Sequence, residues 1–516
     1  MDVPFSYDVL AYPSKFFLQT HPDRLATLAT LFGMTPQPVE NCRVFELGCG
    51  NGSNLISQAF GLPDAQFIGI DLGEKHIEEA KRSAAELGLS NIEFHSLDLM
   101  DLSTADFGKF DYITAHGLFS WVPEPVRIRT LSLFREMLNE NGIGYISYSA
   151  FPGAHHRQMV QEIMRFHTRD ISEPAEKVEK AISFLSFLTE NTSERGVFGR
   201  ILQHDHQRHN SHDAADIFHD DLSDMNRAFY FHEFAKLLND EGLQYLAEAE
   251  LHAMGTHGLS ADAKAFIESV PDIVEKEQYL DFLRGRIFRQ TLFCHKEIEL
   301  QRNPSPDVID KFLFASSVEP QSTNIDLASQ KNEKFIGFRG VGIEIDEPMA
   351  KAALFYLGTI WGRRVKFAEL IENAKALLEE RGFSTDDWEQ HIDTCRKILL
   401  QICLGTNIVE LHISETESFM EVSLRPEINA LSLWQLQNAD NILTQLNIDM
   451  KIEDKVSRHL LELLDGTRNK LQLLPAMKDF IRKSDGIEDK PGMLNNLPGW
   501  LDESLIELAR VGLFKS

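Results

Sequence analysis

The sequence predicts an α/β protein built on a Rossmann-like sheet of mainly parallel strands. Three observations predict this fold. Short apolar segments alternate with helical segments from Arg43 to Ser149, which is the pattern of a parallel sheet. The first apolar segment leads directly into a glycine-rich turn, Gly48-Cys49-Gly50-Asn51-Gly52. Several segments end in a polar residue, and ligands of open α/β sheets bind at the carboxyl ends of the strands.

The first part of the chain provides five strands of this sheet and the helices between them. A helix from Asp23 to Phe32 precedes the first strand, a second begins near Ser53, and a third spans about 74–87 with Ile77, Ala80 and Ala84 on one side. The five strands are expected over 43–48, 66–71, 91–97, 110–115 and 142–149.

The sheet is expected to close only much later in the chain. A helix over 231–241 leads into a sixth strand over 242–248, and a seventh strand is predicted over 288–294. The residues between the fifth strand and this helix, about 151–228, are then a mostly helical insertion, and about 259–286 form a smaller one. Both insertions are placed to build a substrate cleft.

The last two hundred residues predict a mainly α-helical region. The segment 302–306, Arg-Asn-Pro-Ser-Pro, is typical of a linker, and the polar stretch 315–335 is expected to be a loop. Three helices near 347–360, 366–380 and 385–402 precede two short strands over 408–413 and 419–424, which is a winged-helix-like order. The expected domains are a cap over 1–40, a ligand-binding domain over 41–300, a winged-helix-like domain over 301–425 and a helical domain over 426–516.

Composition restricts the classes of partner. The chain of 516 residues carries a formal net charge of −28, which repels nucleic acid unless a basic patch is concentrated somewhere. A basic protein segment is a more natural macromolecular partner, although the acidity also serves solubility alone. Neither a membrane span nor a signal peptide is expected. Five scattered cysteines indicate free thiols in the cytoplasm.

The glycine turn has the spacing G-x-G-x-G after a carboxylate, Glu46, whereas dinucleotide-binding folds have G-x-G-x-x-G. The chain in this respect resembles class I S-adenosylmethionine (SAM) methyltransferases. SAM carries a sulfonium and an ammonium group, and an acidic side chain is favourable near these cations. The resemblance implies SAM as the cofactor and S-adenosylhomocysteine (AdoHcy) as the product.

Further segments resemble bacterial methyltransferases with a methyltransferase regulatory domain, among them rickettsial lysine methyltransferases that modify an outer-membrane protein. The segments that carry this resemblance are Tyr7-Asp8, Tyr12-Pro13-Ser14, Thr20-His21-Pro22, 116–123 (His-Gly-Leu-Phe-Ser-Trp-Val-Pro), 218–220, 230–234, 282–284, 288–292 and 464–468. The resemblance places a regulatory segment over about 214–297. Ala11 and the stretch 148–154 depart from the family pattern next to the expected substrate cleft.

The strand ends and the glycine turn provide the candidate cofactor residues. Asp71 is expected to hold the ribose hydroxyls and Asp98 the adenine edge, although both aspartates are also suited to ordinary loop capping. The complete set is Glu46, Gly48, Cys49, Gly50, Gly52, Asn54, Asp71, Leu72, Asp98, Leu99 and His116.

Candidate acceptor residues surround the end of the fourth strand. His116 is expected to orient the acceptor or take its proton, and Trp121 and Tyr148 are further catalytic candidates. Tyr7, Tyr12, Trp121 and Tyr148 are candidates for lining the acceptor site, although packing alone also explains each of these aromatic residues. Histidines between His204 and His212 lack the other ligands of a convincing metal site, so no metal is expected.

Three functions remain open at this point. The first is a SAM-dependent protein methyltransferase acting on lysine side chains. The second is a small-molecule methyltransferase whose extra domains form a lid or a homodimer interface, and the third is a non-catalytic SAM-binding regulator.

Overall fold

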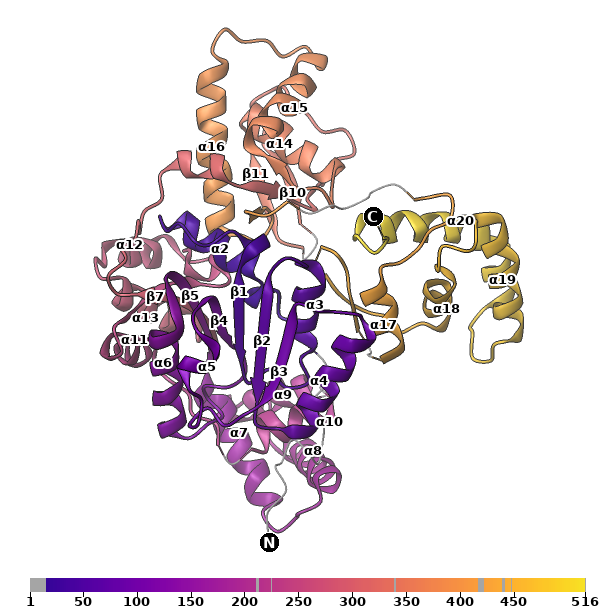
Figure 1. The fold of residues 1–516 in the computed structure, drawn as a ribbon. Coiled ribbons are helices and arrows are strands. Elements are labelled where there is room, and N and C mark those ends of the chain that lie inside the picture. Colours follow the sequence, from indigo (N-terminus) through magenta and orange to yellow (C-terminus); the bar gives the residue numbers. More distant parts are fainter. Residues whose placement is uncertain are drawn as a thin grey trace. The chain divides into compact units, whose positions relative to one another are not determined.

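The computed structural model describes residues 15–209, 213–223, 225–337, 340–415, 422–438, 441–446 and 448–515. The chain forms two compact units, Met1–Leu300 and Gln301–Ser516, which carry the indigo-to-pink and the salmon-to-yellow colours of Figure 1.

The first unit is built on a seven-stranded sheet with the order β3-β2-β1-β4-β5-β7-β6. Strands β1 to β5 are parallel, and β7 runs antiparallel to both β5 and β6. The seven predicted strands are confirmed, with the bounds β1 Arg43–Leu47, β2 Gln66–Asp71, β3 Ile92–Ser96, β4 Phe110–Ala115, β5 Leu138–Ser149, β6 Leu243–Glu248 and β7 Phe288–His295.

Helices cover the sheet and bury its apolar residues. Val44, Phe45 and Leu47 of β1 are completely buried, as expected for a central parallel strand that is covered on both faces. The helices between and beside the strands are α2 Pro22–Leu31, α3 Ser53–Gly61, α4 Glu74–Glu86, α5 Thr104–Phe107, α6 Glu124–Met137, α11 Phe231–Asp240, α12 Ala261–Ser269 and α13 Ile273–Arg284. On α4 the buried apolar residues are Ile77, Ala80 and Ala84, the stripe that the sequence predicts.

The expected helical insertion follows β5. It consists of α7 Ala154–His167, α8 Pro174–Asn191, α9 Val197–His209, α10 Ala214–Asp216 and the π-helical turn η3 Ile217–Asp221. These helices gather at one end of the sheet, below the strands in Figure 1. Val160, Met164, Val178, Leu185 and Leu202 form a small apolar core of their own, so the insertion is a packed subdomain rather than a loose loop.

The second unit contains the three predicted helices, as α14 Pro348–Thr359, α15 Phe367–Glu380 and α16 Trp388–Gly405. The strands in this first part of the unit are β8 Leu313–Ala315, β9 Glu319–Pro320, β10 Glu333–Ile336, β11 Gly342–Ile345, β12 Val365–Lys366 and β13 Glu410–His412. The expectation of a loop over 315–335 is therefore wrong at both of its ends. Strand β13 lies in the first predicted strand of the pair. Of the second, 419–424, residues 419–421 lie outside the described residues, and residues 422–424 are not part of a strand.

The C-terminal part of this unit is mainly helical, as predicted. It contains α17 Ala430–Asn438, α18 Lys455–Leu463, α19 Lys470–Lys483 and α20 Lys490–Arg510. A short hairpin that the sequence did not indicate, β14 Asn441–Leu443 with β15 Asp449–Lys451, separates the first two of these helices. Among the described helices of both units, none is long and apolar enough to cross a membrane.

Candidate cofactor site

The predicted cofactor residues meet at the carboxyl ends of neighbouring strands. In the register of the sheet, Glu46 of β1 lies between Gly69 of β2 and Thr114 of β4. Asp71 is the last residue of β2, and His116 directly follows β4. A side chain built on Gly48 would meet Leu118 at 3.2 Å, so the glycine turn lies against the segment that follows β4.

Glu46 is buried with only one of its two oxygens satisfied. Its Oε1 accepts a hydrogen bond of 2.8 Å from Asn54 Nδ2, whereas Oε2 is buried with no hydrogen-bond partner in the described structure. Burial raises the pKa of Glu46 to about 7, with a further contribution from the charge of Asp71 and an opposing one from the Asn54 hydrogen bond. A buried carboxylate oxygen without a partner is costly, and a ligand ammonium group would satisfy it.

The glycine turn leaves room for a ligand on one side and none on the other. Gly50 has φ +56°, and a side chain built on it would meet nothing within 4 Å. Gly52 has φ +74°, and its added Cβ would lie 2.6 Å from the ring of Phe94. Glycine is thus required at 52 for the packing of α3 against the sheet, while the open space at 50 is the place where a ligand can approach the backbone.

Asp71 stabilises this turn directly. Its Oδ2 accepts the Gly50 N–H at 2.9 Å and its Oδ1 accepts the Gly73 N–H at 2.8 Å. The loop-capping alternative is therefore present in the structure. It does not exclude the ribose role, because each carboxylate oxygen has a second lone pair.

The aspartate that follows β3 also accepts a backbone N–H group of its own loop. Asp98 is exposed and accepts the Met100 N–H at 2.9 Å. The side chains of Leu72 and Met100, which follow β2 and β3, are 52% and 49% exposed, whereas Leu99 and Cys49 are buried. Burial raises the pKa of the Cys49 thiol, so it remains an uncharged part of the turn. Exposed apolar side chains beside Asp98 suit the flat, largely apolar face of an adenine ring.

His116 is held between two aromatic rings. The ring of Phe17 stacks on it at 3.7 Å between centroids, with an interplanar angle of 21°. Its Nδ1 lies 2.8 Å from the hydroxyl of Tyr145 in β5. Burial, with a smaller effect of the positive charge of Lys15, lowers the pKa of His116 to about 3. The imidazole is therefore neutral at physiological pH, which favours orientation of an acceptor over acceptance of its proton.

Tyr148, a candidate for the acceptor site, lies in the hydrophobic core. It is completely buried, its ring stacks on Phe234 at 4.1 Å, and its hydroxyl lies 3.3 Å from Thr291 Oγ1. This packing leaves no free face for an acceptor, because successive residues of a strand point to opposite sides and Tyr145 rather than Tyr148 points to His116. The only sequence signal for Tyr145 is this alternation.

Of the three remaining aromatic candidates, the structure describes Trp121. Trp121 is half-buried in the turn that follows β4, and its buried Nε1–H has no acceptor in the described part of the chain. Tyr7 and Tyr12 lie outside the described residues.

The segment before α2 closes against the site through Asn54. The amide Nδ2 of Asn54 donates to Glu46 and to Thr20 Oγ1, and its Oδ1 accepts the Phe17 N–H at 3.0 Å. One side chain at the start of α3 therefore connects the buried carboxylate to the N-terminal segment. The sequence names Asn54 as a cofactor residue but gives no indication of this connection.

The described part of the histidine-rich stretch, His204 to His209, belongs to helix α9 and is partly buried, whereas His212 lies outside the described residues. His209 Nε2 lies 3.1 Å from Asp221 Oδ2, and His206 Nε2 lies 2.9 Å from Ser186 Oγ. Among the residues that the structure describes, no group of histidine, cysteine, aspartate and glutamate side chains is arranged to hold a metal ion.

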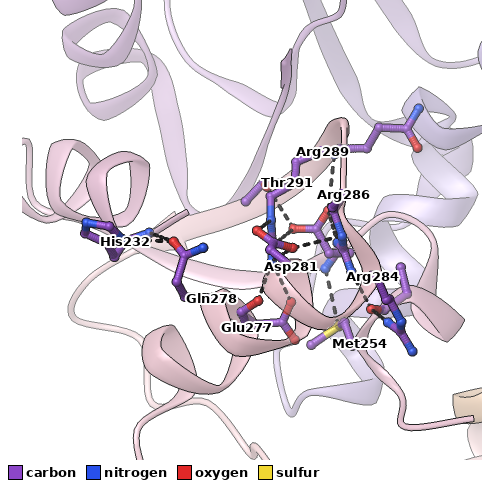
Figure 2. A network of polar contacts seen from close by, with 12 residues as sticks. His232, Met254, Glu277, Gln278, Asp281, Arg284, Arg286, Arg289 and Thr291 are labelled. Atoms are coloured by element: carbon purple, nitrogen blue, oxygen red, sulfur yellow. Dashed lines mark hydrogen bonds and ion pairs between the residues drawn. The ribbon is translucent and has the colours of Figure 1, made fainter. Parts of the chain in front are cut away.

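Arg289 of β7 is the centre of a buried network of ion pairs and hydrogen bonds (Figure 2). Arg289 is completely enclosed and pairs with Glu248 at 2.5 Å, Glu277 at 3.0 Å and Asp281 at 2.9 Å. Glu248 Oε1 also accepts from Thr291 Oγ1 at 2.8 Å, the residue beside Tyr148. The network joins β6, β7 and α13, so it fixes the closing strands of the sheet next to β5.

Comparisons with known proteins support a SAM-dependent methyltransferase. A family profile described as a methyltransferase domain matches residues 38–203, and one described as a predicted methyltransferase regulatory domain matches 213–295. The uncharacterized protein RP789 of Rickettsia prowazekii is 30% identical over 487 residues, which cover 93% of this chain and 86% of that protein. A ubiquinone biosynthesis O-methyltransferase of Bordetella bronchiseptica is 30% identical over 86 residues, or 17% of this chain.

A solved structure resembles nearly the whole chain. The structure of PKMT2 from Rickettsia typhi in complex with AdoHcy has a TM-score of 0.87 and 25% identity, and the match covers 98% of this chain and 99% of that one. The orphaned oxygen of Glu46 and the open space at Gly50 fit such a cofactor. The chain therefore belongs to the bacterial class I SAM-dependent methyltransferases that carry a methyltransferase regulatory domain.

Proposed function

We propose that this methyltransferase acts on a protein, at the amine of lysine side chains. The observation that carries the proposal is the similarity to PKMT2 over nearly the entire length of both chains, second unit included. The match to the small-molecule O-methyltransferase is confined to a short segment. A net charge of −28 also favours a basic acceptor.

The cofactor supplies an electrophilic methyl group, and the residues of the chain hold and orient the reactants. Glu46 would bind the ammonium group of SAM through Oε2, Asp71 would hold the ribose hydroxyls, and Asp98 with Leu99 would meet the adenine. The neutral imidazole of His116, fixed by Phe17 and Tyr145, would accept a hydrogen bond from the acceptor amine. Alignment of this kind is the main contribution a protein makes to methyl transfer.

The pKa of Glu46 predicts how cofactor affinity depends on pH. The unliganded carboxyl has a pKa raised to about 7, whereas the ammonium of SAM favours the ionised form. Binding therefore releases a proton below pH 7, and affinity should rise from pH 5 to pH 7 by up to about tenfold per unit and then level off. The ammonium, with a pKa of about 8, stays charged in this window.

Calorimetric titration with SAM at pH 5.5, 6.5 and 7.5 measures this dependence. The variant Glu46→Gln should bind more weakly at pH 7.5 and lose most of the pH dependence. A wild-type dissociation constant that is the same at all three pH values would refute the role of Glu46.

Incubation of the full chain with labelled SAM and a bacterial lysate tests the proposed acceptor class. The expected result is label in protein, recovered after hydrolysis as methyllysine. Label only in small metabolites would support a small-molecule methyltransferase instead, and measurable SAM binding without any transfer would support a non-catalytic regulator.

A further inference from the structure

A lysine of the chain itself lies next to the expected acceptor site. Lys15 Nζ is 2.6 Å from Asp216 Oδ1, which joins the N-terminal segment to helix α10 of the insertion. Two residues further along, Phe17 stacks on His116 and donates its N–H to Asn54. The positive charge of Lys15 also contributes to the lowered pKa of His116, so its ammonium group lies near the end of β4, where the sheet topology places the reacting groups.

Asp216 pairs with a cation from outside the insertion, unlike Asp220 and Asp221. Asp221 pairs with Arg157 at 2.9 Å, Arg208 at 3.1 Å and His209 at 3.1 Å, all within the insertion. Asp220 lies 4.0 Å from Arg157 of the same insertion. The cation beside Asp216 comes from the N-terminal segment instead.

Burial makes this contact selective for a cation. The side chain of Asp216 is 8% exposed, whereas that of Lys15 is 34% exposed. Leaving a buried carboxylate without a cation is strongly unfavourable. Any group that displaces Lys15 must therefore bring a positive charge of its own, and the ammonium group of a lysine side chain is the most closely matched replacement.

We propose that Asp216 is the carboxylate that receives the amine of the methyl acceptor, and that Lys15 holds this position while no acceptor is bound. The inference rests on the proposed function, because it presumes an amine acceptor. Under this proposal Asp216 selects the acceptor, and Lys15 competes with the acceptor amine for Asp216. The competitor reduces apparent acceptor affinity by the fraction of molecules in which it is seated.

The experiment compares initial rates of transfer from labelled SAM to poly-L-lysine, and to lysate protein, at increasing acceptor concentration. Lys15→Met should lower the KM for the acceptor by about threefold or more, whereas Lys15→Arg, which keeps the cation, should behave as wild type. Asp216→Asn should raise the KM by about tenfold, because it loses a charge-assisted bond. The dissociation constant for AdoHcy should stay within about twofold in all variants, which also reports that they fold.

Two exposed residues of the same types provide matched controls. Lys81→Met on α4 and Asp213→Asn at the N-cap of α10 remove the same charges at exposed positions and should leave the KM unchanged. Equal KM values in wild type, Lys15→Met and Asp216→Asn would overturn the inference and leave the proposed function intact. Absence of transfer to any protein by wild type, despite AdoHcy binding, would overturn both.

Discussion

The variant Gly50→Val should lose SAM binding by at least about 100-fold, or ~2.7 kcal/mol, while the chain still folds. The added side chain would enter the open space beside the turn, where nothing lies within 4 Å, and would occupy the volume that the cofactor needs. It would also strain the backbone, because φ at this position is +56° and β-branched residues avoid that region. Calorimetry with SAM and with AdoHcy measures the loss.

Gly88 provides the matched control for the backbone strain that a valine causes at positive φ. It also has positive φ, +69°, with nothing near an added Cβ, and it follows α4 away from the strand ends. Gly88→Val should destabilise the protein to a similar extent and leave cofactor affinity unchanged. Wild-type affinity in a folded Gly50→Val variant would contradict the placement of the cofactor.

The variant Arg289→Met should lower the free energy of unfolding of the first unit by about 3–5 kcal/mol. Glu248, Glu277 and Asp281 would lose the buried cation that they share (Figure 2). Arg286 would still pair with Glu248 and Asp281, so Glu277 is affected most. The aliphatic replacement keeps much of the contact with Phe231, whose ring lies 3.9 Å below the guanidinium. Most of the cost is therefore electrostatic, and urea unfolding followed by circular dichroism measures it.

The pH dependence of the unfolding free energy of Arg289→Met shows whether unpaired carboxylates cause the loss of stability. Burial already raises the pKa of Glu277 and of Asp281, and removal of Arg289 should raise both further. Carboxyls whose pKa is raised in the folded state stabilise at low pH and lose that contribution as pH rises, so the deficit should be smaller at pH 5 than at pH 8.

Arg510→Met provides the control for the loss of an arginine as such. Arg510 pairs with Glu507 on an exposed helix face, and its removal should cost less than about 1 kcal/mol. An Arg289→Met variant as stable as Arg510→Met, with no dependence on pH, would show that the network contributes little.

The sheet and the cofactor turn could be predicted because local signals specify them. The glycine spacing after Glu46 and the alternation of apolar and helical segments locate β1 to β5 within a few residues. Strands β6 and β7 follow from short apolar segments despite the long insertion before them. The glycines at 50 and 52 both have positive φ, which is why their positions are so informative.

Side-chain partners across the fold could not be predicted in this way. Tyr148 and Tyr145 both follow from the sequence as strand residues, but only the register of β5 decides which one faces His116. The link from Asn54 to Phe17 and the pairing of Lys15 with Asp216 join residues far apart in the chain. Short edge strands such as β9 and the β14–β15 hairpin have too few residues for a periodic pattern.

Calorimetric titration of the full, folded chain with SAM and AdoHcy tests the central claim most directly, namely that the glycine turn after β1 and the unpaired oxygen of Glu46 bind the methyl donor. The prediction is saturable one-to-one binding of both compounds in wild type, weaker binding of both by Glu46→Gln, and none detectable with Gly50→Val. Absence of binding heat with either compound in wild type, over a range of temperatures, would contradict the claim.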